Sequence, residues 1–136
     1  KFNYMKNLIL TLCLLFTTIL FSQSKYEDFV GNWESNETEY TLIISKHFAK
    51  DHFKFLNYRL ITKTSYSGEQ KIETDYSPEE FVKAENNKLH TFIAWQFTDE
   101  TKNYYCDAIY EKVNKNKLKV TLTGSSNMVL HYKRKE

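Results

Sequence analysis

The chain has 136 residues, 41% of them hydrophobic and 16% aromatic, and a formal net charge of +2 at pH 7. Of its 19 basic residues, Lys1 and Lys6 precede residue 25, which leaves 17 basic and 17 acidic residues in the rest of the chain. This balance excludes the basic character expected of a nucleic-acid-binding protein. We therefore expect no nucleic acid among its partners.

An apolar segment near the start of the chain has the pattern of a secretory signal peptide. Lys6 supplies the positive start, residues 8–21 carry no charge, and residues 22–24 (SQS) give the small-x-small pattern of a cleavage site. We predict a signal peptide over 5–24, preceded by an upstream extension over 1–4. The uncharged run is shorter than the roughly 20 residues of a membrane-spanning helix. We expect no membrane span after cleavage; an uncleaved membrane anchor is the alternative.

The two cysteines argue against a lipid anchor and against an internal disulfide. Cys13 follows Leu12 in the middle of the apolar run, whereas a lipoprotein needs a cysteine at the end of that run. We therefore expect a secreted or periplasmic protein. Cys106 is the single cysteine of 25–136, so this region must hold its core together by packing alone. Its length predicts one domain over 25–136, which we expect to be a monomer.

Short strand-like segments recur from residue 29 onward, which is typical of a β-sandwich or a β-barrel. The segment 51–66 is long for one strand, so we expect it to bend or to carry a bulge. A turn at Ser67-Gly68 separates it from the next strand. The strands expected in this half of the chain cover 29–35, 39–46, 51–66 and 70–75.

Residues 77–85 are compatible with two kinds of structure. The sequence of 77–80 (SPEE) has the form of a helix start, since Ser77 can cap, proline suits the first helical position and Glu80 can complete a capping box. This predicts a short helix over 78–85. A strand through Phe81 is the alternative. A turn follows at 86–88 in either case.

The second half of the chain alternates apolar and polar residues more regularly. In 117–123, for example, Leu118, Val120 and Leu122 share one face. The expected strands here are 88–98, 104–113, 117–123 and 128–133. Together the segments predict an all-β fold of about eight strands, joined as an antiparallel up-and-down barrel. A barrel of that size can be filled by side chains or can hold one small ligand.

Gly31-Asn32-Trp33, within FVGNWE, resembles the G-x-W signature that opens the first strand of lipocalins and fatty-acid-binding proteins, the calycin group. The segment is also similar to the V-G-x-W start of small secreted bacterial proteins of unknown function. The resemblance implies a lipocalin-like barrel whose closed end is plugged by Trp33. It also implies that a basic residue near the end of the last strand, Arg134 or Lys133, packs across that tryptophan. Gly31, Trp33 and Arg134 are thus expected at the barrel base. The final strand lacks the Arg-x-Tyr pair of fatty-acid-binding proteins, so fatty-acid binding is not implied.

Aromatic residues on neighbouring strands have two interpretations. They can pack across the strands as a core, or they can line an apolar pocket. If the barrel is hollow, we expect its ligand cavity to be lined by Trp95, Phe97, Tyr104, Cys106 and Tyr110.

Catalytic and metal-binding patterns are weak. His47 and His52 flank a possible hairpin tip near Asp51, but their spacing matches no strong zinc pattern. The acid pairs at 79–80 and 99–100 fall in expected turns or a helix start, where solvated acids are usual. There is no H-E-x-x-H, no G-x-S-x-G and no glycine-rich phosphate loop.

We therefore expect no catalytic residue, no metal and no cofactor. The sequence favours a secreted, non-catalytic binding module for a small apolar ligand or a protein partner. A secreted inhibitor or interaction protein with a solid barrel is the first alternative, and a small hydrolase is the second.

Overall fold

The computed structural model describes residues 26–47, 52–96 and 101–136. The predicted signal peptide (5–24), the upstream extension (1–4) and Phe97 lie outside these residues. Among the described residues there is no α-helix, and a 3-10 turn, η1 (Glu27–Phe29), precedes the first strand. The described part of the chain contains no helix of the length and apolarity needed to cross a membrane.

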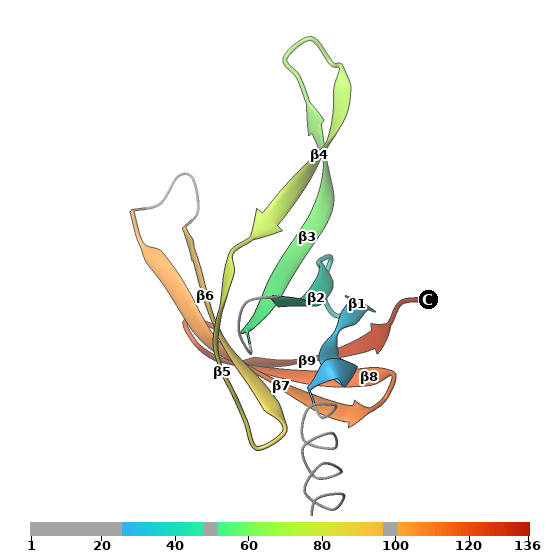
Figure 1. Cartoon of the computed structure of the whole chain (residues 1–136). Coiled ribbons are helices and arrows are strands. Elements are labelled where there is room, and N and C mark those ends of the chain that lie inside the picture. Colours follow the sequence, from blue (N-terminus) through green and yellow to red (C-terminus); the bar gives the residue numbers. More distant parts are fainter. Residues whose placement is uncertain (1–25, 48–51, 97–100) are drawn as a thin grey trace, which may run out of the picture.

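The strands of the described residues are β1 (Gly31–Glu34), β2 (Thr41–His47), β3 (His52–Thr64), β4 (Gln70–Ser77), β5 (Glu79–Glu85), β6 (Lys88–Gln96), β7 (Asn103–Asn114), β8 (Lys117–Gly124) and β9 (Met128–Arg134). Within the described ranges these nine strands form one sheet in the order β4-β3-β2-β1-β9-β8-β7-β6-β5 (Figure 1). All of its pairs are antiparallel. The predicted all-β fold with up-and-down strand order is confirmed.

The long third strand changes partner along its length. Its first half pairs with β2, from His52 opposite His47 to Tyr58 opposite Thr41. Its second half pairs with β4, from Asn57 to Thr64, and the two strands project from the sheet as a hairpin (Figure 1). The register is continuous in both pairings, so a change of partner accounts for the length of the segment that we expected to bend or bulge.

The predicted helix over 78–85 is wrong, because Glu79–Glu85 form β5. Phe81 and Ala84 are three residues apart, which matches the spacing of a helix face. In β5 a register shift after Phe81 leaves Val82 as an extra, bulged residue, so that both Phe81 and Ala84 turn toward the core. β5 is the additional strand, so the described strands number nine and not eight, and Pro78 separates it from β4.

The two edges of the described sheet, β4 and β5, are not joined by backbone hydrogen bonds. They are nevertheless consecutive in the chain, and β5 packs against β3 through aromatic side chains. The ring centroid of Phe81 lies 4.8 Å from that of His52, 5.7 Å from that of Phe53 and 6.5 Å from that of Phe55. We call this contact the β3–β5 seam.

The buried core occupies the inner face of the curved sheet. Alternate residues of β2 and β8 point inward, with Leu42, Ile44, Leu118 and Val120 all nearly inaccessible to solvent. Phe29 of η1 is also fully buried and joins this cluster. The remaining buried hydrophobic members of the cluster are Trp33, Phe53, Leu89, Ala108, Tyr110 and Tyr132.

Candidate ligand-binding cavity

One end of the inner face is closed by Trp33 and Arg134. Trp33 is fully buried, and its indole N–H donates a hydrogen bond of 2.9 Å to the carbonyl of Phe29. Arg134 lies opposite Trp33 in the pairing of β1 with β9, and its guanidinium carbon is 4.2 Å from the indole centroid. This geometry suits a cation–π interaction. Arg134, and not Lys133, therefore makes the contact anticipated from the lipocalin resemblance.

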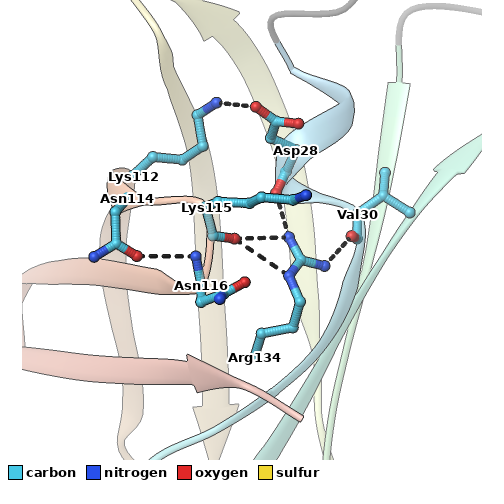
Figure 2. A network of polar contacts seen from close by, with 7 residues as sticks. All are labelled: Asp28, Val30, Lys112, Asn114, Lys115, Asn116 and Arg134. Atoms are coloured by element: carbon cyan, nitrogen blue, oxygen red, sulfur yellow. Dashed lines mark hydrogen bonds and ion pairs between the residues drawn. The ribbon is translucent and has the colours of Figure 1, made fainter. Parts of the chain in front are cut away.

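The guanidinium of Arg134 also donates hydrogen bonds to the backbone carbonyls of Asp28, Val30 and Lys115 (Figure 2). Its Nη1 donates to Val30 at 2.8 Å, and its Nη2 donates to Asp28 at 2.7 Å and to Lys115 at 3.2 Å. The Asp28 carboxylate in turn accepts a hydrogen bond of 2.7 Å from Lys112. Lys112 holds the pKa of Asp28 below its usual range, mainly through this hydrogen bond. The network ties η1 to β7, to β9 and to the β7–β8 turn.

Gly31 leaves the space that this arrangement needs. Its φ of +148° is one that residues with a side chain rarely adopt. A Cβ atom at this position would overlap the guanidinium of Arg134. The glycine therefore permits both the backbone path of β1 and the close approach of the arginine.

We call the end closed by Trp33 and Arg134 the filled end. Beyond it, the inner face lines a cavity of about 920 Å³ that is open to solvent. More of its wall is apolar than polar. The order of residues along β9 shows its position: Leu130 and Met128 line the cavity, whereas Arg134 lies at the filled end. The wall residues are Glu37, Thr38, Tyr40, Asn57, Arg59, Asp75, Tyr76, Ser77, Pro78, Glu79, Ile93, Ala94, Trp95, Cys106, Tyr110, Val120, Leu122, Ser126, Met128, Leu130 and Tyr132.

The structure brings together part of the predicted ligand lining. Trp95, Cys106 and Tyr110 all lie in the wall of the cavity. Tyr104 is not part of the wall, and its ring instead stacks on Trp95 with centroids 5.7 Å apart and ring planes 15° apart. Phe97 belongs to the residues outside the described ranges.

The main polar feature of the wall is the carboxylate of Glu79, in the first position of β5. Its Oε1 accepts hydrogen bonds from the hydroxyls of Thr91, at 2.5 Å, and Tyr110, at 2.6 Å. Its Oε2 accepts a hydrogen bond from the side-chain amide of Asn57. These donors come from β3, β6 and β7, so the carboxylate joins opposite parts of the sheet.

Burial is the main cause of the pKa shifts in this cluster. It raises the pKa of Glu79, although the hydrogen bonds from Thr91, Tyr110 and Asn57 oppose the shift. Burial also raises the pKa of Tyr110 and of Tyr132, and the negative charge of Glu79 adds to both shifts. Within the described ranges, no Lys, Arg or His forms an ion pair with Glu79.

The expectation that residues 79–80 are both solvated acids is therefore wrong for Glu79. Glu80 is exposed as expected, but alternation along β5 turns its neighbour inward. The sequence pattern of a helix start concealed this, because acids are usual in a first helical turn.

A second polar group lies in the wall formed by β3 and β4. The Nε of Arg59 is 2.8 Å from the Oδ2 of Asp75, and the Tyr40 hydroxyl donates to the same oxygen at 3.0 Å. Arg59 also pairs with Glu39 at 3.0 Å and lies over the ring of Tyr40, 5.1 Å from its centroid. Hydrogen bonds from Arg59 and then from Tyr40 lower the pKa of Asp75. The guanidinium is thus engaged by acids of the protein itself.

The histidines form no metal-binding group in the described ranges, although His131 Nδ1 lies 3.3 Å from the carboxylate of Glu37, a residue of the cavity wall. His47 and His52 lie opposite each other in the pairing of β2 with β3, and Asp51 lies outside the described residues. No group of three or more His, Cys, Asp or Glu side chains that could hold a metal is found in the described part of the chain. None of the cavity-wall residues found there is a histidine.

Comparison with known protein families, curated proteins and solved structures finds no match to this chain.

Proposed function

We propose that the sheet is a lipocalin-like barrel that binds a small molecule with a largely apolar body, and that the protein acts as a non-catalytic binding module. The observation that carries this proposal is the division of the inner face into a filled end and a cavity of about 920 Å³. That volume lies within the range of about 300–1,000 Å³ common for small-molecule sites. A mostly apolar wall with a few placed polar groups is also typical of such sites.

Two features support a barrel. The edge strands β4 and β5 are consecutive, so the chain itself connects the two edges of the sheet at Pro78. The β3–β5 seam then brings β5 against β3 through side chains. Trp33 and Arg134 would form the barrel base, as the resemblance implies. Export to the periplasm or the medium rests on the predicted signal peptide over 5–24.

The cavity favours ligand binding over the alternatives from the sequence. An interaction protein with a solid barrel would need a filled interior. A hydrolase that uses histidine would need a histidine and a carboxylate that both face the cavity. The wall acid Glu37 does lie beside His131, at 3.3 Å, but His131 is exposed and is not among the wall residues of the described part of the chain. Glu79 is held by hydroxyl and amide donors instead.

Binding can be tested with the neutral fluorophore N-phenyl-1-naphthylamine, whose emission rises in apolar surroundings. Leu130→Trp fills the cavity, and Val129→Trp adds the same ring to the outer face of β9, where Val129 is 44% exposed. We expect Leu130→Trp to weaken binding at least about tenfold and Val129→Trp to change it less than about twofold. Circular dichroism checks that both variants fold. A wild-type protein that does not bind, or a Leu130→Trp variant that binds equally well, would contradict the proposal.

A further inference from the structure

We propose that the cavity selects apolar molecules that carry a protonated amine, with the carboxylate of Glu79 as the partner of that amine. This inference rests on the proposed function and names the chemical class of its ligand. Three properties of the wall lead to it: an acid that pairs with no basic side chain of the described residues, an excess of negative charge, and aromatic rings.

The first property is the unmet bonding capacity and charge of Glu79. A carboxylate has about four lone-pair sites for hydrogen-bond donors. Thr91, Tyr110 and Asn57 are its donors in the described part of the chain, and all are uncharged. Glu79 is half-buried, and removing a carboxylate from water is costly without a positive partner. An ammonium group in the cavity would provide both a further donor and the opposite charge.

The second property is the charge of the whole wall. The acids Glu37, Asp75 and Glu79 line the cavity, whereas Arg59 is the basic side chain among the wall residues of the described chain. Asp75 and Glu39 already engage the guanidinium of Arg59. A cationic ligand would therefore enter a favourable field, and an anionic ligand would meet like charges without a free basic partner.

The third property is the position of aromatic rings beside the acid. Tyr132, Trp95 and Tyr40 contribute to the same wall. Tyr132 is close enough to Glu79 for the carboxylate charge to raise its pKa. Rings of this kind bind ammonium groups over their faces while they also contact apolar carbon. A neutral alcohol could donate a hydrogen bond to Glu79, but it would leave the negative charge without a positive partner.

The test uses ligands that share one skeleton and differ only in the polar group: 4-phenylbutylamine, 4-phenylbutanol and 4-phenylbutyrate. Isothermal titration calorimetry at pH 7.5 gives their dissociation constants with the wild-type protein. We expect the amine to bind at least about tenfold more tightly than the alcohol, and the carboxylate to bind most weakly. This ranking requires no variant, so it holds as a test even if a substitution disturbs folding.

Glu79→Gln keeps the shape of the side chain and removes its charge, and Glu80→Gln is the matched control on the exposed neighbour. We expect Glu79→Gln to abolish most of the preference for the amine and Glu80→Gln to retain it. If the alcohol or the carboxylate binds as tightly as the amine, or if Glu79→Gln keeps the preference, the inference is wrong while the proposed function stands. If neither these ligands nor N-phenyl-1-naphthylamine binds, both are wrong.

Discussion

The contact between Trp33 and Arg134 depends on the space that Gly31 leaves, although Arg134 is distant from both residues in sequence. The pairing of β1 with β9 places Arg134 directly opposite Trp33, and side chains opposite each other in antiparallel strands share a face. A Cβ atom at Gly31 would overlap the guanidinium of Arg134. The resemblance of Gly31-Asn32-Trp33 to the calycin signature pointed to these residues. The sequence alone left Lys133 as an alternative, because the register decides which basic residue faces inward.

Replacing Gly31 tests this dependence. We expect Gly31→Ala to lower the free energy of unfolding by more than about 1 kcal/mol, because alanine is strained at this φ and its methyl group overlaps Arg134. In an Arg134→Ala background, Gly31→Ala should cost less, because the overlap is gone. Urea unfolding followed by circular dichroism measures each variant. Lys133→Ala, on the exposed neighbour, is the control and should change stability by less than about 0.5 kcal/mol. Strictly additive costs would show that the two positions do not interact.

The strands differ in how well their sequences predict them. The segment 117–123 alternates without interruption and becomes β8 almost unchanged. Asn86 and Asn87, expected in a turn, both have positive φ, of 50° and 63°, which suits a tight hairpin between β5 and β6. The segment 78–85 could not be assigned in the same way, because the bulge at Val82 breaks the alternation that marks a strand.

Substitutions at Phe81 and Val82 distinguish the stability that comes from the packing of β5 against β3 from the stability that comes from its pairing with β6. Phe81 makes the ring contacts of the β3–β5 seam, whereas Val82 is 55% exposed on the opposite side. We expect Phe81→Ala to cost about 2–3 kcal/mol, less than a fully buried phenylalanine would, and Val82→Ala to cost under about 0.5 kcal/mol. Thermal unfolding measures the stability, and amide exchange of β5 shows whether the seam has opened. Equal effects at the two positions would mean that the seam adds no stability.

The inner face of the molecule combines a core that the sequence largely reveals with a cavity that it does not. Alternation identifies inward-facing residues such as Leu118, Tyr110 and Trp95. It cannot show whether facing side chains meet, because that depends on the curvature of the sheet and on packing between distant strands. Glu79 was missed for a related reason: its donors Asn57, Thr91 and Tyr110 are 22, 12 and 31 residues away in sequence.

The raised pKa of Glu79 has a consequence for the stability of the whole protein. At pH values between its ordinary value of 4.5 and its raised value, the folded protein holds a proton that the unfolded chain has lost. The contribution of this group to the free energy of unfolding is therefore full below that window, and it is lost as pH rises through the raised pKa. Asp28, which is exposed, and Asp75, which is half-buried, have lowered pKa values and act in the opposite direction.

Glu79→Gln isolates the contribution of Glu79 from that of the other acids. We expect the melting temperature of this variant, relative to that of the wild type, to rise as pH increases from about 4 to 8, because glutamine does not titrate. Differential scanning calorimetry at several pH values measures this difference. Glu80→Gln should show no such trend. A relative melting temperature that falls with pH would mean that the hydrogen bonds to Glu79 outweigh its burial.

The β3–β5 seam differs from the contacts between neighbouring strands of the described sheet, because it is held by side chains: ring contacts and the hydrogen bond from Asn57 to Glu79. The neighbouring strands are joined by backbone hydrogen bonds, whereas Phe81 meets Phe53 and Phe55 through ring contacts. Hydrophobic association weakens on cooling, since its driving force near room temperature is entropic. The ring contacts of this seam should therefore weaken in the cold, so that the wall of the cavity opens along this line more easily at low temperature than at room temperature.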